Sequence, residues 1–116
     1  MQTERIAKIS QDGFKKGVFE SPIPVVVDFY ADWCPPCKMV SPILEKLSTE
    51  YEGKVSFVKV NVDDEPELAS AYSIMSIPTV MFFAKGKAND AIIGAVSAPA
   101  YKEKIEAAIK VSGKAA

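Results

Sequence analysis

The chain has 116 residues, 48% of them hydrophobic, and a formal net charge of -1 at pH 7. This length fits one domain, residues 1–116, with a core that needs neither a metal nor several disulfides. The near-zero charge gives no indication of nucleic-acid binding, and the longest apolar runs are too short to span a bilayer.

The N-terminal part of the chain predicts a strand followed by a helix. Residues 1–10 lack the apolar stretch of a secretory signal peptide, so we expect a cytoplasmic protein. Residues 4–9 form a short candidate strand. Ser10 is placed to cap a helix that carries Phe14 and Val18 on one face.

A second strand and a long helix follow. Residues 24–30, PVVVDFY, form a near-continuous apolar run, typical of a parallel strand covered on both faces. The next apolar side chains recur at spacings of three and four, which predicts a helix. Pro42 lies inside that pattern and is expected to kink the helix, and Gly53 is expected to end it. The inward face of this helix comprises Cys37, Val40, Leu44, Leu47 and Tyr51.

The middle of the chain predicts a further strand and a short helix. Residues 54–62 are rich in the β-branched and aromatic residues that strands favour. Residues 63–72 predict a helix with Asp64 and Pro66 at its start, because proline is favoured in the first turn of a helix.

The C-terminal part predicts a hairpin and a last helix. Residues 78–83 and 91–96 read as strands joined by the turn around residues 85–87. Ser97 and Pro99 then begin a helix. Strands alternating with helices imply parallel crossovers, while the hairpin makes the sheet mixed. We therefore predict an α/β fold in which a mixed sheet of about five strands is flanked by about four helices. The last helix is expected to face inward with Tyr101, Ile105, Ala108 and Ile109.

Cys34 and Cys37 are the only two cysteines, and they lie at the start of the predicted long helix. The first sulfur of such a pair is close to unpaired backbone N–H groups and to the positive end of the helix dipole, which favour thiolate over thiol. A thiolate of this kind attacks disulfides. Cys37 lies one turn further along, on the apolar face, where burial favours the thiol until it is needed. The pair therefore predicts thiol–disulfide exchange, in which Cys34 attacks and Cys37 resolves the mixed disulfide.

These residues alone leave other uses of the pair open. Half of a zinc site shared by a dimer also has two cysteines at this spacing, and two buried cysteines can be purely structural. The chain has no histidine, which excludes an imidazole base and the haem-attachment motif. It has no second cysteine pair to complete a zinc site, so we expect no metal and no bound cofactor.

Asp28 is an acidic residue inside an otherwise apolar strand, where a carboxylate is costly unless it is paired or useful. One interpretation is a carboxylate at a strand end that caps a nearby helix. The other places it beneath the cysteine pair, where burial raises its pKa and suits a general base that accepts the proton of Cys37 through a water. Lys59 in the next strand is then either its charge partner or an ordinary outward-facing lysine.

The sequence resembles the thioredoxin family over about residues 4 to 110. The resemblance is carried by VDFYADWCPPCKMVSPILEKL, VKVNVD, YSIMSIPTVMFF and the glycine of IIGAV, in the family's order and spacing. W-C-x-P-C-K with a downstream I-P-T is a specific pattern, whereas C-x-x-C alone is not. The resemblance implies the thioredoxin fold and roles for four residues. Cys34 matches the nucleophile and Cys37 the resolving cysteine, while Asp28 matches the buried acid and Lys59 its neighbour.

The resemblance also implies a flat apolar surface for client proteins around an exposed Cys34 sulfur. Pro78 matches a cis-proline opposite the active site, and Ile77 the residue whose backbone pairs with an extended client segment. Trp33 is expected to be half exposed. Taken without the resemblance, Pro78 is expected to be trans, Trp33 to pack in the core and Gly94 to mark a bulge or bend. The expected surface comprises Trp33, Pro36, Ile77, Pro78, Gly94 and Ala95.

Two positions depart from the family's common pattern. Pro35-Pro36 replaces the usual Gly-Pro between the cysteines, which removes one N–H donor near the Cys34 sulfur and stiffens the loop. The reduction potential is therefore expected to differ from the family's, with a sign that the sequence does not give. Tyr30 stands where a tryptophan is common, and we expect this change to affect packing and fluorescence more than mechanism.

The activity that the resemblance implies is reduction of protein disulfides by a monomer that binds neither nucleic acid nor membrane. Its electron source is a thioredoxin reductase, which carries the flavin and uses NADPH, so this chain needs no cofactor. By analogy, the clients are ribonucleotide reductase, peroxiredoxins and methionine sulfoxide reductases. Two alternatives stay open: a docking module that uses the apolar surface, and a disulfide oxidase or isomerase of an oxidising compartment.

Overall fold

The computed structural model describes residues 6–113, so the first two residues of the predicted strand 4–9 lie outside the described residues. The elements alternate as the sequence predicts, with a π-helical turn, η1, continuing the first helix. Their bounds are β1 Ala7–Lys8, α1 Gln11–Phe14, η1 Lys15–Phe19, β2 Val25–Tyr30, α2 Pro35–Glu50, β3 Ser56–Asn61, α3 Pro66–Ala71, β4 Thr79–Ala84, β5 Lys87–Ile93 and α4 Ala98–Ser112.

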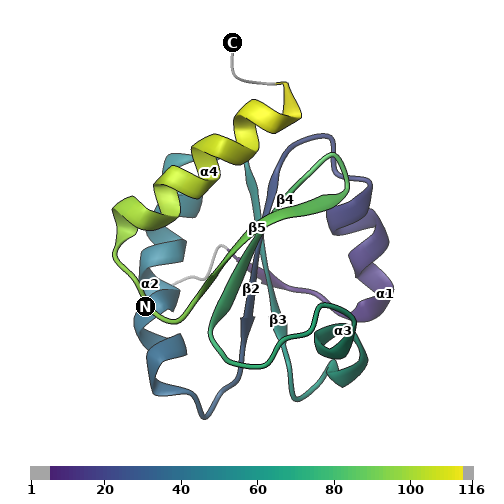
Figure 1. The fold of residues 1–116 in the computed structure, drawn as a ribbon, viewed down its shortest axis with the longest axis vertical. Helices are drawn as coiled ribbons and strands as arrows, with labels where there is room; N and C mark the ends of the chain where they lie inside the picture. The colour runs from purple at the N-terminus through teal and green to yellow at the C-terminus, as the bar shows by residue number, and fades with distance from the viewer. Residues whose placement is uncertain (1–5, 114–116) are drawn as a thin grey trace.

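One five-stranded sheet forms the middle of the molecule, in the order β1-β3-β2-β4-β5 (Figure 1). The first three of these strands run parallel to one another. β4 is antiparallel to β2, and β5 is antiparallel to β4. The predicted mixed α/β sheet is confirmed, and β2 is its central strand.

The helices cover both faces of this sheet, with α2 and α4 on one side and α1 and α3 on the other (Figure 1). Successive side chains of β2 point to opposite faces, so one apolar run supplies both cores. Val26 packs in the core under α2 and α4. Val25, Val27 and Phe29 pack in the core under α1 and α3. This explains why the strand has no polar face.

The long helix α2 has the inward face that its periodicity predicts, because all five of its expected inward residues are buried. Pro42 lies inside the helix, on an exposed position, and the helix continues past it to Glu50. The predicted end at Gly53 is wrong. Tyr51 is the C-cap, and its backbone N–H donates to Leu47 O, while Gly53 lies two residues further on with a φ of 82°.

Two other boundaries also differ from the prediction. α3 begins with Glu65 as its N-cap, not Asp64, followed by Pro66 in the first turn. The strand predicted at residues 91–96 extends instead over Lys87–Ile93, directly after the turn at residues 85–86. Gly94, with a φ of 92°, ends the strand, because this left-handed conformation does not continue an extended chain. Residues 94–96 are therefore a loop between β5 and α4.

Candidate redox site

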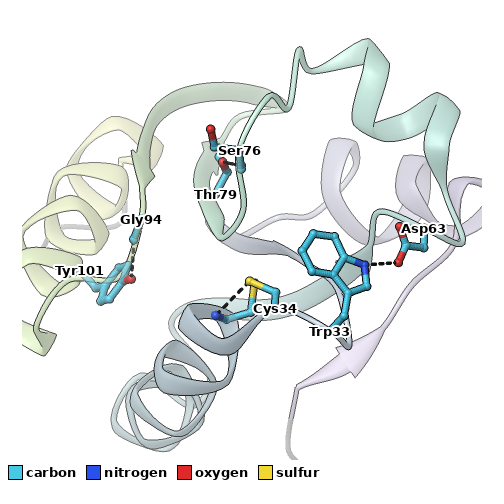
Figure 2. The surroundings of a disulfide bond; sticks show 8 residues. Trp33, Cys34, Asp63, Ser76, Thr79, Gly94 and Tyr101 are labelled. Carbon is cyan, nitrogen blue, oxygen red and sulfur yellow. Dashed lines mark hydrogen bonds between the residues drawn. A yellow bond between two sulfur atoms is a disulfide. The ribbon is translucent and has the colours of Figure 1, made fainter.

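Cys34 and Cys37 form a disulfide at the N-terminal end of α2, the helix end at the centre of Figure 2. Cys34 is the N-cap residue of the helix, and the Cα atoms of the two cysteines are 5.3 Å apart. The backbone N–H of Cys37 donates to the Cys34 sulfur at 3.2 Å. The predicted position of one sulfur at a helix N-terminus, with its partner one turn inside, is confirmed.

The two prolines between the cysteines occupy the first two positions of the helix. Proline is favoured there because its fixed φ suits the helix and its missing N–H has no helical partner to lose. Pro35 and Pro36 therefore start the helix but offer the sulfur no donor. The N–H of Cys37 is the first one in the helix that can meet the Cys34 sulfur.

The disulfide is more buried than the sequence indicated. Cys34 exposes 2% of its surface and Cys37 exposes 4%, so the expectation of an exposed Cys34 sulfur is wrong for this disulfide state. The pair forms a small apolar cluster with Ala31, against which Val62 and Ile77 also pack. Burial follows because neighbouring loops from β3 and from the segment before β4 close over the end of the helix.

Asp28 lies behind the disulfide, on the α2 side of β2. It is 5% exposed, and its Oδ1 is buried without a hydrogen-bond partner. It lines a cavity of about 190 Å³ together with Cys37 and Lys59. Lys59 is its neighbour across the parallel ladder between β2 and β3. Burial raises the pKa of Asp28 to about 7, and the positive charge of Lys59 acts in the opposite direction.

Trp33 forms one rim of the site. Its side chain is 66% exposed, so core packing of this residue is wrong and the expectation of an exposed ring beside Cys34 is confirmed. Its indole Nε1–H donates to Asp63 Oδ2 at 2.8 Å, which fixes the ring on one side of the disulfide (Figure 2). The ring also lines a groove of about 190 Å³ whose other wall includes Met75 and Ile77.

The loop before β4 lies across from the disulfide. The Ile77–Pro78 peptide bond is cis, as the family resemblance implies, and the trans alternative is wrong. Thr79 donates its hydroxyl to Ser76 O at 2.6 Å, which closes this loop (Figure 2). Ile77 is half-buried against the disulfide cluster, whereas Pro78 is buried.

The loop after β5 forms the opposite rim. Gly94 N–H donates to Pro78 O at 2.8 Å, which ties this loop to the cis-proline loop. The hydroxyl group of buried Tyr101 donates to Gly94 O at 3.5 Å and accepts from Val96 N–H at 3.4 Å (Figure 2). The irregularity in the β4–β5 ladder is at residues 82–83, so Gly94 marks the end of β5 rather than a bulge. Ala95 follows it at an exposed position.

The comparisons with known proteins agree with this geometry. The family model described as thioredoxin matches residues 5–110. The chain belongs to the thioredoxin family. It is 44% identical over 100 residues to thioredoxin 1 of Nostoc sp. (strain PCC 7120 / SAG 25.82 / UTEX 2576), covering 86% of this chain and 94% of that protein. It is 49% identical over 89 residues to a thioredoxin of Synechocystis sp. (strain ATCC 27184 / PCC 6803 / Kazusa), covering 77% and 83%. It is 42% identical over 103 residues to the chloroplastic M-type thioredoxin of Spinacia oleracea, covering 89% and 57%.

Membership of the thioredoxin family, together with the vicinal cysteine pair, identifies the activity as thiol–disulfide oxidoreduction and the chain as a protein-disulfide reductase. Over residues 6–113, no helix is both long and apolar enough to cross a membrane. The same residues contain no group of three or more histidine, cysteine or acidic side chains arranged to hold a metal ion.

Some residues of this thioredoxin site were not recognised as part of it in the sequence. Asp63 is an exposed acid with no motif around it, and its bond to Trp33 spans 30 positions. Tyr101 was predicted to face inward, but nothing in the helix pattern indicates that its hydroxyl group reaches the Gly94 loop. Tyr30 lines the cavity beside Asp28, where the strand's alternation was the available signal.

Proposed function

We propose that this thioredoxin, with its W-C-P-P-C sequence, reduces client disulfides through a mixed disulfide. The Cys34 thiolate attacks one sulfur of the client disulfide, and the other client sulfur leaves as a thiolate. Cys37 then loses its proton and attacks the Cys34 sulfur, which releases the second client thiolate. Two electrons and two protons have then passed to the client, and the chain is left with the Cys34–Cys37 disulfide.

Asp28 is the proton acceptor for Cys37 in this proposal. Three observations support the role: the unpartnered Oδ1, the cavity that Asp28 shares with Cys37, and a pKa of about 7. A base is most effective when its pKa lies near the working pH, because it is then available in both protonation states. The cavity is large enough for a water to carry the proton between the two groups. Lys59 adjusts the proton affinity of Asp28 through its charge.

The client binds across the rim described above. The backbone of Ile77 pairs with an extended client segment next to the buried sulfur. Since Cys34 is only 2% exposed in the disulfide state, partners gain access to it by displacing the side chains that pack around the cluster. The apolar surface offered to the client comprises Trp33, Pro36, Ile77, Pro78, Gly94 and Ala95.

The electron donor in this proposal is a thioredoxin reductase that uses flavin and NADPH. The clients are disulfide-bearing proteins such as ribonucleotide reductase, peroxiredoxins and methionine sulfoxide reductases. A reductase of this kind works in a reducing compartment, so we place it in the cytoplasm, as a monomer of one thioredoxin domain. The family model's match to residues 5–110 supports the single domain.

The disulfide at the mouth of α2, directly in front of buried Asp28, is the observation that carries the proposal. The test is dithiothreitol-driven reduction of insulin by the wild-type protein and by the Cys34→Ser, Cys37→Ser double variant. We expect the wild type to accelerate the reaction and the double variant to lose the acceleration. Equal rates would overturn the proposal and favour a docking module.

Equilibration against glutathione separates a reductase from an oxidase. We expect a reduction potential nearer to about -270 mV than to about -120 mV, the values typical of a reductase and of a strong oxidase. A value at the oxidising end would contradict the reductase role.

A further inference from the structure

Tyr30 lies at the end of β2, two positions after Asp28. Side chains two positions apart in a strand share one face of the sheet, so Tyr30 and Asp28 both face the α2 side. Both line the cavity of about 190 Å³ behind the disulfide. The tyrosine ring is therefore part of the wall that surrounds the unpartnered Asp28 oxygen.

The ring of Tyr30 also contacts the one cation that adjusts Asp28. Lys59 Nζ lies 5.4 Å from the centroid of the ring, within the distance at which an ammonium group is attracted to an aromatic face. Lys59 in turn neighbours Asp28 across the β2–β3 ladder and lines the same cavity. Tyr30, Lys59 and Asp28 thus form a connected group.

A lysine at the mouth of a cavity does not hold its charge in place unaided. Its ammonium group is strongly hydrated and sits on a flexible four-carbon stem, so open water competes for it. We propose that Tyr30 is a positioning residue whose ring holds the Lys59 ammonium beside the Asp28 carboxyl group and so sets how strongly Asp28 binds a proton. Tyr30 acts through Lys59 and does not touch the reacting sulfurs.

Other titratable groups also face Asp28, and the test has to hold them constant. Asp32, Cys37 and Lys38 line the same cavity. From α4, Tyr101 interacts with the Asp28 charge. From β1, Lys8 is the ladder neighbour of Lys59 and pairs with Asp64 at 3.8 Å. None of these groups is changed in the variants below, and using the disulfide form prevents the cysteines from titrating.

The experiment follows the ¹³C resonance of the Asp28 carboxyl group by NMR during a pH titration of the oxidised, full-length protein. Tyr30→Phe keeps the aromatic face, and we expect it to titrate like the wild type. Tyr30→Leu removes the face, which lets Lys59 move into water and take its charge away from Asp28. We expect the titration midpoint to rise by about half a pH unit. An unchanged or lower midpoint in Tyr30→Leu, or an equal rise in Tyr30→Phe, would overturn the proposal.

A double-mutant cycle separates this effect from a change in the shape of the cavity. In a Lys59→Gln background, we expect Tyr30→Leu to leave the Asp28 midpoint unchanged, because the charge that Tyr30 holds is absent. A rise of the same size in both backgrounds would mean that Tyr30 acts on Asp28 directly, and would contradict the proposal. If Tyr30→Leu does not fold, Tyr30→Trp supplies a stronger aromatic face and should lower the midpoint relative to Tyr30→Phe. A Trp midpoint at or above that of Phe would refute it.

The consequence for turnover rests on the proposed role of Asp28 as the base, and the two ideas can fail separately. The NMR midpoint reports on Tyr30 whether or not Asp28 takes part in catalysis. If Asp28 is the base, the pH profile of mixed-disulfide resolution should move upward with the midpoint in Tyr30→Leu. A shifted midpoint with an unshifted profile would support the positioning role of Tyr30 and refute the base role of Asp28.

Discussion

The two faces of the sheet differ in what they place next to β2. Under α1 and α3, the core is apolar and rich in aromatic rings. Phe14 packs edge-on against Phe83 with ring centroids 5.8 Å apart, and Tyr72 packs against Phe83 at 5.6 Å. Aromatic pairs of this geometry stabilise a fold through packing alone.

Under α2 and α4, the core begins in the same way but is interrupted near the end of β2. Val26 is in the apolar cluster, while Asp28, two positions on, has a buried oxygen without a partner and borders a cavity. A buried unpaired polar group costs stability, so natural folds keep few of them. The comparison teaches that this protein confines its costly polar groups to the end of the one helix that carries the disulfide.

The largest effect should separate the two cysteines of the site. Cys37→Ser should accumulate a covalent mixed disulfide with an oxidised client, because Cys34 still attacks but nothing resolves the adduct. Cys34→Ser should form almost none, since Cys37 lies one turn inside the helix on its buried face. Non-reducing electrophoresis with mass spectrometry measures the adduct. Comparable adducts from both variants would contradict the division of roles.

The next effect is a stability difference that depends on pH. The folded pKa of Asp28, about 7, lies above its ordinary value of 3.8, so between these values the unfolded state is ionised while the folded state stays protonated. Its contribution to stability is therefore lost as the pH rises from about 4 to about 7. Relative to Asp28→Asn, wild-type stability should fall by about 4 kcal/mol over this range.

Urea unfolding of both oxidised proteins at several pH values measures this difference. Asp90→Asn, which removes an exposed carboxylate that pairs with Lys104, serves as a control for the change in net charge. Parallel stability curves for the wild type and Asp28→Asn would show that Asp28 is not held protonated by burial.

Asp28→Asn should also slow the resolving step by about 100-fold while client affinity is preserved, because only proton transfer is removed. Single-turnover decay of the mixed disulfide gives the rate, and binding of the client to a Cys34→Ser, Cys37→Ser background gives the affinity. An unchanged rate would exclude Asp28 as the base.

On the other face, Phe14→Leu should show the opposite pattern. Loss of the ring removes its contacts with Phe19, Tyr72 and Phe83, and we expect a cost of about 1–2 kcal/mol in the free energy of unfolding. Insulin-reduction activity per folded molecule should stay at the wild-type level. A drop in activity at full folding would show that the two faces are coupled.

The smallest effect concerns the rim of the site. Trp33→Phe keeps an aromatic ring but removes the N–H that donates to Asp63 at 2.8 Å. Since an exposed hydrogen bond contributes about 0.5–1.5 kcal/mol, the KM for a protein client should rise by about 2- to 10-fold with kcat nearly unchanged. Asp63→Asn is the matched variant and should act in the same direction. A change in kcat alone would argue against a role in docking.

Much of the fold could be predicted because it depends on patterns within single segments. The apolar run of β2 and the three- and four-residue spacing in α2 repeat with the periods of buried strands and amphipathic helices. The boundary errors at Gly53 and at the end of β5 have a different origin. In both places, the end of the element depends on local backbone angles that residue type alone does not fix.

The sequence by itself determined the cysteine pair, its position at a helix start and the unusual acid in β2, since each is visible within a few neighbouring residues. The tertiary structure alone decided that Cys34 is buried, that Tyr101 holds the Gly94 loop and that the ring of Tyr30 faces Lys59. These features join side chains from different strands, loops and helices. Contacts of that kind depend on how the elements pack in three dimensions, and no local period in the sequence records them.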